Sequence, residues 1–262
     1  MKKLFLLLIV LYIGYFAFFS IENEIGYNTI ETSLTAGEFT IPVLTYHSIS
    51  DHSSSEYAVT REKFEQQMAY LHSHGYRALT LAQFELYMKQ QKPVDEKCVL
   101  LTFDDGYANN YDVAFPILKK YGYTATLFVI TDWVNSKPYM KWTQIKELHQ
   151  AGWDIMPHSR THPHLPLETA AKQKDEILGS KKAIEHILHS KVDAFAYPYG
   201  HRSQMTVDLI HNNGYSYAFT FDDGLTSSGQ NPYLLKRLIV SGKEPLQTFI
   251  KRLNQKNLMQ AY

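Results

Sequence analysis

Apolar residues along this chain follow two patterns: short continuous runs, and longer segments in which they recur every three or four positions. Short runs are typical of buried parallel strands, and the longer pattern is typical of amphipathic helices. From residue 39 onward the two patterns alternate. Strands are expected at 41–46, 99–103, 125–130, 153–156, 194–197, 217–221 and 235–240. Helices are expected at 60–75, 81–90, 110–121, 143–150, 168–189, 203–212 and from 245 onward.

Local signals refine two of these helices. Thr60 can cap the first helix, because its side chain can accept a hydrogen bond from a free backbone N–H. Pro116 lies inside the segment 110–121 and predicts a kink or a late helix start, because proline lacks a backbone N–H. At least six strand–helix units in succession predict a parallel sheet or barrel. In barrels of this kind the catalytic residues lie at the carboxyl ends of the strands.

Composition narrows the class of protein. A chain of 262 residues with 45% hydrophobic residues is long enough for one α/β domain with a sizeable core. Lys and Arg number 26, as do Asp and Glu, and this balance argues against broad electrostatic binding of nucleic acid. The 19 Tyr, 14 Phe and 3 Trp suit either sugar stacking or core packing. Cys98 is the single cysteine, so an intrachain disulfide is excluded, and we expect it to be a small core residue.

The first residues predict a membrane anchor. Lys2 and Lys3 precede an apolar run from Leu4 to Phe19, and a short basic region before an apolar stretch is a secretion signal. Counted to Ile21, the run approaches the minimum length that spans a bilayer, and no A-x-A-like cleavage site follows it. We therefore expect a single-pass anchor in the cell membrane with the bulk of the chain outside, or a secreted protein if the signal is cleaved.

The chain then divides into three parts. Residues 1–21 form the expected anchor, the polar residues 22–38 a stalk, and residues 39–262 one globular domain. Residues 34–37 are similar to a lipoprotein processing box, but Glu38 stands where the lipidated cysteine would be required. Lipidation is therefore excluded.

Two adjacent carboxylates follow the predicted strand 99–103, in the pentapeptide Thr-Phe-Asp-Asp-Gly at 102–106. At a strand end, Asp104 and Asp105 could divide their work, one binding a cation and the other acting as a base. Repulsion between them favours a metal or a proton in the site. The same letters also make an ordinary turn, because Asp and Gly are turn residues. The pentapeptide alone leaves both possibilities open.

Two histidines four residues apart, His158 and His162, follow the predicted strand 153–156. Imidazoles at this spacing can bind one cation, and with one carboxylate they form the three-ligand open site of a catalytic metal. The chain has 12 histidines, so ordinary surface histidines are the alternative. Pro163 could direct either His162 or His164 inward.

A third strand end, at 194–200, reads Ala-Phe-Ala-Tyr-Pro-Tyr-Gly and could expose backbone N–H groups or an aromatic ring to a substrate. By itself it is a weak signal. Three strand ends that carry Asp-Asp, His-x₃-His and Tyr-Pro-Tyr-Gly in that order are a much stronger signal together.

In these motifs the chain resembles the polysaccharide deacetylases of carbohydrate esterase family 4, which contain the NodB homology domain. Residues 102–106 match the first family motif, 158–162 the second, and 194–200 a variant of the third, in the family's order and spacing. The resemblance covers about residues 39–240. It implies a distorted (β/α)₇ barrel, one divalent cation, and hydrolysis of N-acetyl groups on an amino-sugar polysaccharide.

The first predicted strand suggests a subgroup. Residues 42–47 (Pro-Val-Leu-Thr-Tyr-His) and 64–81 resemble the biofilm poly-N-acetylglucosamine deacetylases, a branch in which the domain is circularly permuted. In that branch the strand with the catalytic-acid histidine comes first in the chain, which assigns this role to His47. The histidine that the wider family has near the C-terminus is absent from residues 238–242, and the permutation accounts for its absence.

Two positions depart from the family pattern. The third motif of the wider family carries an arginine that orients the base, and Ala196 stands in its place. Arg237, in the last predicted strand, is the candidate replacement, with ordinary surface pairing as the alternative. Residues 220–224 repeat Thr-Phe-Asp-Asp-Gly letter for letter, but no helix and no histidine pair follow them closely, so we expect this copy to be a turn.

The resemblance assigns the chemical roles. Asp105, His158 and His162 would bind the cation, expected to be Zn²⁺, with Co²⁺ or Ni²⁺ as alternatives. Asp104 would be the general base that takes a proton from water, and His47 the general acid that protonates the departing amine.

The resemblance also implies which residues contact the substrate, and other functions stay open as alternatives. The backbone N–H of Tyr199 would hold the oxyanion, and the rings of Tyr46, Trp142 and Tyr197 would contact the sugar. We expect a monomer that acts on an extracellular polysaccharide, contacts the membrane through its anchor, and binds no nucleic acid. The alternatives are a peptidoglycan N-acetylglucosamine deacetylase, an esterase for O-acetylated xylan, and a catalytically silent glycan-binding protein. The intact Asp-Asp and His-His sets argue against the last.

Overall fold

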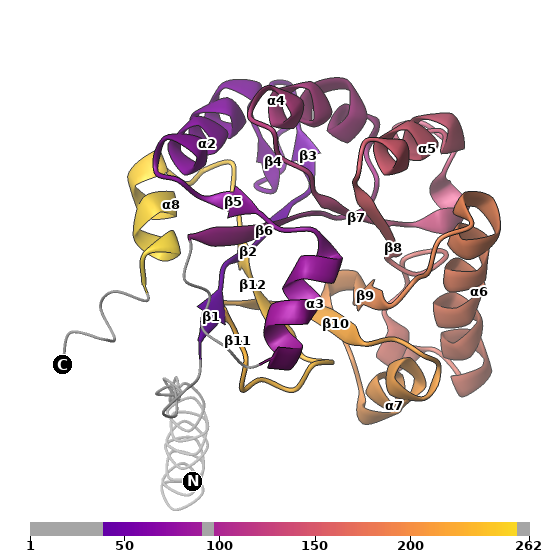
Figure 1. Cartoon of the computed structure of the whole chain (residues 1–262). Coiled ribbons are helices and arrows are strands. Elements are labelled where there is room, and N and C mark those ends of the chain that lie inside the picture. The colour runs from indigo at the N-terminus through magenta and orange to yellow at the C-terminus, as the bar shows by residue number, and fades with distance from the viewer. Residues whose placement is uncertain (1–38, 91–96, 256–262) are drawn as a thin grey trace, which may run out of the picture. The chain divides into compact units, whose positions relative to one another are not determined.

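The computed structural model describes residues 39–90 and 97–255 (Figure 1). The predicted anchor at 1–21 and stalk at 22–38 lie outside these residues. Among the helices within 39–90 and 97–255, none is both long and apolar enough to cross a membrane.

Seven parallel strands form a nearly closed barrel at the centre of the domain (Figure 1). They are β2 (Val43–Tyr46), β6 (Cys98–Phe103), β7 (Thr126–Val129), β8 (Asp154–Pro157), β9 (Ala194–Ala196), β10 (Tyr217–Asp223) and β12 (Leu235–Ile239). Their order around the sheet is β8-β7-β6-β2-β12-β10-β9, and every neighbouring pair is parallel. The end strands β8 and β9 are in contact, and His158 Nδ1 lies 2.8 Å from the carbonyl oxygen of Ala196. The predicted α/β barrel of parallel strands is therefore confirmed.

Short strands extend this barrel at its margins. β1 (Thr40–Ile41) pairs antiparallel with β11 (Thr226–Ser227), and β3 (Ser48–Ile49) pairs with β4 (Ala58–Val59). β5 (Arg77–Ala78) runs parallel to the first residues of β6.

The barrel strand β2 comes first in the chain but lies between β6 and β12 in the sheet. Its register pairs Tyr46 with Phe103, and the N–H of Asp104 donates to the carbonyl of Tyr46 at 2.9 Å. His47, the first residue after β2, therefore lies next to Asp104, the first residue after β6, although the two residues are far apart in sequence.

The helices are α2 (Arg61–Ser73), α3 (Leu81–Gln90), α4 (Phe115–Lys120), α5 (Trp142–Gln150), α6 (Ala170–Leu188), α7 (Gln204–Asn212) and α8 (Leu246–Leu253). Most of them surround the barrel, but α3 lies across one end of it, where Phe84 packs against Phe219 (Figure 1). The side chain of Thr60 caps α2, as predicted, and Thr169 caps α6. The predicted helix 110–121 begins as a wide turn, η1 (Asn110–Ala114), and becomes α-helical only at α4. Pro116 explains this late start, because it cannot donate the hydrogen bond of a regular turn.

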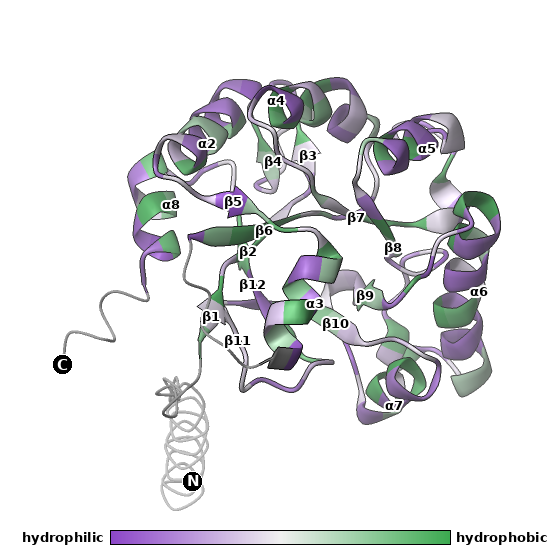
Figure 2. Ribbon diagram, in the orientation of Figure 1, coloured by the Kyte–Doolittle hydropathy of each residue, from purple (hydrophilic) through white to green (hydrophobic). Residues whose placement is uncertain are grey.

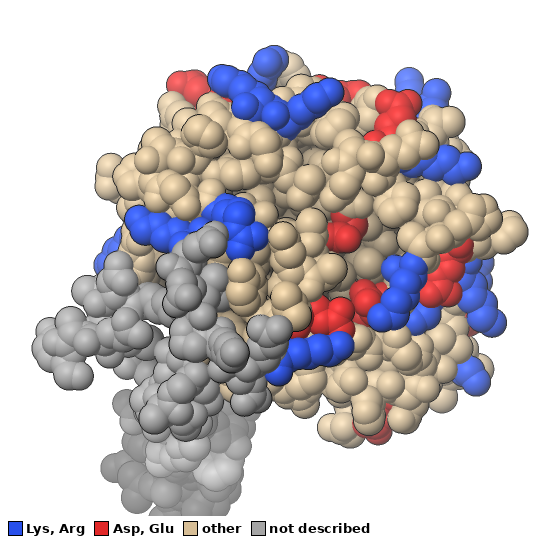
Figure 3. Space-filling view, viewed as in Figure 1, with Lys and Arg blue, Asp and Glu red and all other residues tan. Residues whose placement is uncertain are grey.

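The core fills the barrel and the space beneath the helices. Figure 2 shows apolar residues along the strands and mixed faces along the helices, as amphipathic helices on a barrel require. Phe103, Phe128 and Phe219 are fully buried, and burial of one such side chain contributes roughly 1.5–3 kcal/mol. Cys98 is buried in β6, which confirms it as a core residue. On the face in Figure 3, Lys and Arg are interspersed with Asp and Glu over the described surface.

Candidate metal centre and catalytic groups

The three predicted motifs meet at the carboxyl ends of three strands of the same barrel. Asp104 and Asp105 follow β6, His158 and His162 follow β8, and Tyr199 follows β9 in the short helical turn η4 (Pro198–Gly200). Because parallel strands all end at the same rim of a barrel, side chains that are far apart in sequence converge there.

Asp105, His158 and His162 form a compact triangle of possible metal ligands. The two Nε2 atoms are 3.2 Å apart, and Asp105 Oδ1 lies 3.7 Å from His158 Nε2 and 3.6 Å from His162 Nε2. A tetrahedral cation with bonds of about 2.0–2.2 Å needs ligand atoms roughly 3.3–3.6 Å apart. The residues therefore fit one divalent cation of the zinc type.

Hydrogen bonds and burial prepare both histidines as ligands. The contact between His158 Nδ1 and the carbonyl of Ala196 places the ring proton on Nδ1 and leaves Nε2 free to bind a metal. Burial and the neighbouring His158 lower the pKa of His162 to about 3, so His162 is neutral at pH 7. Burial raises the pKa of Asp105, with the charge of Asp104 as a further cause.

The structure also resolves the choice between His162 and His164. His162 has a positive φ of 59°, which turns its ring toward His158. His164 instead lies with its Nδ1 2.8 Å from Nδ1 of His201, away from the triangle.

Glu176 of α6 supports the loop between the two ligand histidines, and the sequence did not point to it. One of its oxygens accepts from the N–H groups of Arg160 and Thr161, each at 2.8 Å, and the other accepts from the Thr161 hydroxyl at 2.7 Å. Glu176 is fully buried next to Ile177 on the inner face of its helix. A carboxylate on the apolar stripe of α6 was the available signal, because such a group needs buried partners.

Asp104 is held by Arg237 and not by the ligand triangle. The guanidinium donates to both carboxylate oxygens, at 2.8 and 2.7 Å, and it also donates to the carbonyl of Thr220 at 3.0 Å. Arg237 is 0% exposed and Asp104 1% exposed. Burial alone would raise the pKa of Asp104, but the charge and hydrogen bonds of Arg237 outweigh it and lower the pKa to about 2. Arg237 thus contacts Asp104 as expected, and Asp104 is ionised at neutral pH.

His47 lies on the same rim, beside Asp104. Its ring packs against Tyr57 at 5.3 Å and Phe221 at 5.6 Å, and its carbonyl accepts from Asn110 Nδ2 at 2.6 Å. Burial lowers the pKa of His47, and the charges of Asp104 and Asp105 oppose this effect. Within the described residues its Nδ1 is buried and makes no hydrogen bond.

The loop that carries Tyr199 is held by the second copy of the Asp-Asp pentapeptide. Arg202 donates to the carbonyl of Gly200 at 2.9 Å and to both oxygens of Asp222. Phe221 packs so closely that a Cβ on Gly200 would lie 2.5 Å from the Phe221 Cβ. Among the described residues the backbone N–H of Tyr199 has no acceptor in the protein, so it can donate to a ligand.

The copy ends strand β10 and is not the simple turn that we expected. Asp222 pairs with Arg202, while Asp223 pairs with Arg252 and accepts from the N–H of Ile239. Both carboxylates are engaged by guanidinium groups, and neither belongs to the ligand triangle.

Two of the three predicted sugar-contacting rings are wrong. Tyr46 and Tyr197 are 0% exposed, and their hydroxyls donate to Gln67 and to the carbonyl of Tyr233. Tyr46 packs beneath α2, against Phe64, and Tyr197 is buried directly after β9, so neither ring can reach a substrate. Trp142, the first residue of α5, is partly buried against the core.

A ring that the sequence did not single out, Trp133, lies beside the ligands instead. It is 5.8 Å from the ring of His162 and 4.9 Å from that of Tyr139, which stacks on Tyr107. These aromatic side chains form one wall of the metal centre.

Comparison with known proteins agrees with this geometry. Residues 91–218 match the polysaccharide deacetylase family. YxkH of Bacillus subtilis, whose name places it among the polysaccharide deacetylases, is 38% identical over 201 residues, which are 77% of this chain and 71% of that protein. A poly-β-1,6-N-acetyl-D-glucosamine N-deacetylase of Staphylococcus epidermidis is 32% identical over 211 residues, with coverage of 74% and 72%. The structure of the Streptococcus pyogenes deacetylase PplD in complex with acetate superimposes with a TM-score of 0.79 and 28% identity, over 82% of this chain and 98% of that chain.

The ligand triangle makes a direct prediction about metal content. Changing Asp105, His158 or His162 to alanine should remove most of the bound metal, because the two remaining ligands hold a cation much more weakly than three. His164→Ala should keep the metal, because its ring faces His201. Metal per chain, measured by mass spectrometry on folded variants, checks this. Metal loss in His164→Ala with retention in His162→Ala would mean that the wrong histidine has been assigned.

Proposed function

Because this chain belongs to the polysaccharide deacetylase family, whose members hydrolyse amide bonds, we propose that it removes N-acetyl groups from an extracellular polymer of N-acetylglucosamine, releasing acetate. The observation that carries the proposal is the ligand triangle of Asp105, His158 and His162 beside the ionised Asp104. This arrangement joins a cation site and a base on one rim, as hydrolysis of an unactivated amide requires.

A divalent cation such as Zn²⁺, when bound by these three residues, lowers the pKa of water and polarises a carbonyl. Asp104 takes the proton from the attacking water. Arg237 keeps Asp104 ionised and fixes the direction of its oxygens through two hydrogen bonds. The pairing with Arg237 lowers the pKa of Asp104, which makes it a weaker base than a free carboxylate.

The negative charge that develops on the acetyl oxygen needs a hydrogen-bond donor. The backbone N–H of Tyr199 supplies it, because the loop of Gly200 and Arg202 holds this group without a protein acceptor. His47, in its protonated form, donates to the nitrogen as the C–N bond breaks, so that the sugar leaves as a neutral amine.

The polymer is proposed from the relative in Staphylococcus epidermidis, which is named for its action on poly-β-1,6-N-acetyl-D-glucosamine. Its 32% identity extends over 74% of this chain, and so includes most of the domain. The first-strand position of His47, which resembles that branch, supports the same substrate class.

We also propose that the domain works outside the cell membrane, held by the apolar residues 4–21 after Lys2 and Lys3. A polysaccharide substrate outside the cell requires this location. Fractionation of expressing cells tests it: the chain should stay with the membrane, and a shortened chain in the medium would show a cleaved signal instead.

The proposed substrate predicts from which polymer acetate is released fastest. A soluble segment from residue 39, loaded with Zn²⁺, should release acetate from poly-N-acetylglucosamine faster than from peptidoglycan or acetyl-xylan. Enzymatic measurement of free acetate on the three polymers decides between these substrates. Faster release of acetate from peptidoglycan or from acetyl-xylan would show that this polymer is the substrate instead. A chain that binds one zinc ion but releases no acetate from any of the three polymers would be a glycan-binding protein and not an enzyme.

The two copies of the Asp-Asp pentapeptide should behave differently. Asp104→Asn should keep the metal but abolish turnover, because it removes the base and not a ligand. Asp222→Asn and Asp223→Asn should keep at least about a tenth of the rate, a barrier increase of no more than about 1.4 kcal/mol. The rate of acetate release by the metal-loaded variants measures this. Loss of turnover in a folded Asp223→Asn variant would show that the second copy takes part in the chemistry.

His47 should determine the alkaline limb of the pH–rate profile. A general acid must be protonated, so the rate falls as the pH rises through its pKa. His47→Asn should fold and bind metal, lose about 100-fold in kcat, and show a flattened alkaline limb.

A matched control for this variant is His52→Asn, which changes an exposed histidine of the following loop. It should leave kcat and the profile unchanged. A purely structural His47 would lower the melting temperature of the variant and leave the shape of its profile intact, and that result would remove His47 from the mechanism.

A further inference from the structure

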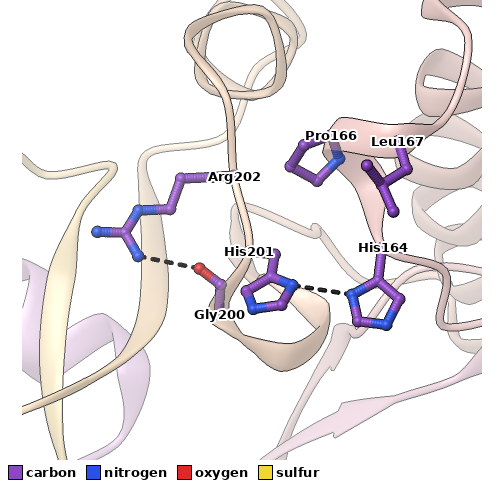
Figure 4. Close-up of a pocket in the computed structure, with 6 residues that line it drawn as sticks. All are labelled: His164, Pro166, Leu167, Gly200, His201 and Arg202. Atoms are coloured by element: carbon purple, nitrogen blue, oxygen red, sulfur yellow. Dashed lines mark hydrogen bonds between the residues drawn. The ribbon is translucent and has the colours of Figure 1, made fainter. Parts of the chain in front are cut away.

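The ring of His47 is held differently from three other histidines at the rim. His158 Nδ1 lies 2.8 Å from the carbonyl oxygen of Ala196. His164 and His201 are joined by a hydrogen bond of 2.8 Å between their Nδ1 atoms (Figure 4). In the part of the chain that the structure describes, the buried Nδ1 of His47 makes no hydrogen bond. The direction of the His47 ring therefore depends on the rings that pack against it and on the backbone that carries it.

Two asparagines hold that backbone. Asn110, the first residue of η1, donates from Nδ2 to the carbonyl oxygen of His47 at 2.6 Å. Asn109 donates from Nδ2 to the hydroxyl of Ser48 at 2.8 Å, and its Oδ1 accepts from the N–H of Ile49 at 3.1 Å. Each of the three residues that follow β2 is therefore bonded to an asparagine side chain.

Both asparagines belong to the stretch of chain that carries the base and one metal ligand. Asp104 and Asp105 precede them by a few residues. The N–H of Asn110 donates to the carbonyl of Tyr107 at 3.0 Å, which ties η1 to the end of β6. A general acid must reach the nitrogen next to the carbon that the activated water attacks, and a misplacement of roughly 1 Å can cost about 100-fold in rate. The hydrogen bonds from η1 to the residues after β2 fix the distance between acid and base.

The amide of Asn110 is buried at a cost to stability. Its side chain is 0% exposed, and within the described residues its Oδ1 makes no hydrogen bond. A buried acceptor without a donor destabilises a fold, so its presence needs an explanation. The N–H₂ group of the same amide provides one, because it is the group that contacts the carbonyl of His47.

We propose that Asn109 and Asn110 are positioning residues that direct the catalytic acid His47 toward the departing nitrogen. The proposal rests on the deacetylase function proposed above and adds two residues to it. They act through the backbone of residues 47–49 and not on the reacting atoms themselves.

A comparison of two substrates isolates the step that needs the acid. The nitrogen of a β-1,6-linked N-acetylglucosamine oligomer must gain a proton as it leaves, whereas 4-nitrophenolate leaves 4-nitrophenyl acetate without one. The quantity to measure is the ratio of kcat/KM for the oligomer to kcat/KM for 4-nitrophenyl acetate, on zinc-loaded protein. His47→Asn should lower this ratio about 100-fold. Asn110→Ala should lower it about tenfold, because a misplaced acid still donates in part, and Asn109→Ala should lower it in the same direction.

A double variant tests whether the asparagines act through His47. Added to His47→Asn, the change Asn110→Ala should leave the ratio where His47→Asn has put it, because no acid remains to be positioned. A further fall of the ratio in the double variant would contradict the proposal.

The matched control is Asn213→Ala. Asn213 also donates from Nδ2 to a backbone carbonyl, that of Leu209, at 2.7 Å. It lies at the end of α7 just before β10 begins, at the opposite end of the barrel from the rim. Its ratio should equal that of the wild type.

An equal loss of rate on both substrates in the asparagine variants, or an unchanged ratio, would overturn the proposal, because neither result affects the acid step alone. If Asn110→Ala does not fold, the less buried Asn109→Ala decides by the same ratio. A wild type that hydrolyses 4-nitrophenyl acetate but releases no acetate from the oligomer would instead overturn the proposed function, and with it the need for an acid.

Discussion

The buried ion pair between Arg237 and Asp104 is the constraint on which the active rim depends. Removing a charge from water costs several kcal/mol, and only a well-placed partner offsets that cost. Here both groups are buried, and the guanidinium reaches the carboxylate from β12 past the intervening strand β2. The ends of β6, β2 and β12 must therefore keep their register. That register also sets His47 beside Asp104 at the end of β2.

Around this fixed pair, the ligands and the N–H donor stand on strained backbone. Asp105, Ser159, His162 and Tyr199 have positive φ angles of 73°, 65°, 59° and 57°. Each costs roughly 1–2 kcal/mol for a residue with a Cβ. Hydrogen bonds that the histidine loop donates to Glu176, and that Arg202 donates to the carbonyl of Gly200, stabilise the loops of His162 and Tyr199. These backbone conformations bring the side chains of Asp105 and His162 together beside His158, where regular strand ends would alternate in direction.

The two copies of the Thr-Phe-Asp-Asp-Gly pentapeptide have different roles in the structure. In the first copy, Asp104 and Asp105 are divided between Arg237 and the ligand triangle. In the second copy, both carboxylates are paired with arginines, and the phenylalanine packs against Gly200 and His47. What separates the copies is the side chains that their carboxylates meet: Asp105 lies beside His158 and His162, whereas Asp222 and Asp223 face Arg202 and Arg252.

The sequence by itself determined the features that depend on local order. Alternating apolar runs and amphipathic segments predicted the strands, the helices and the parallel barrel, and Pro116 predicted the late start of α4. The motifs at 102–106 and 158–162, through the family resemblance, indicated Asp105, His158 and His162 as ligands and left His164 as an alternative. Only the tertiary structure decided which way individual side chains face. It buried Tyr46 and Tyr197, turned His162 and not His164 to the ligands, and brought Glu176 beneath their loop. It also joined Arg237 to Asp104, which lie 133 residues apart. Such contacts depend on barrel curvature and on which strands are neighbours, and neither is encoded in the local pattern of polar and apolar residues.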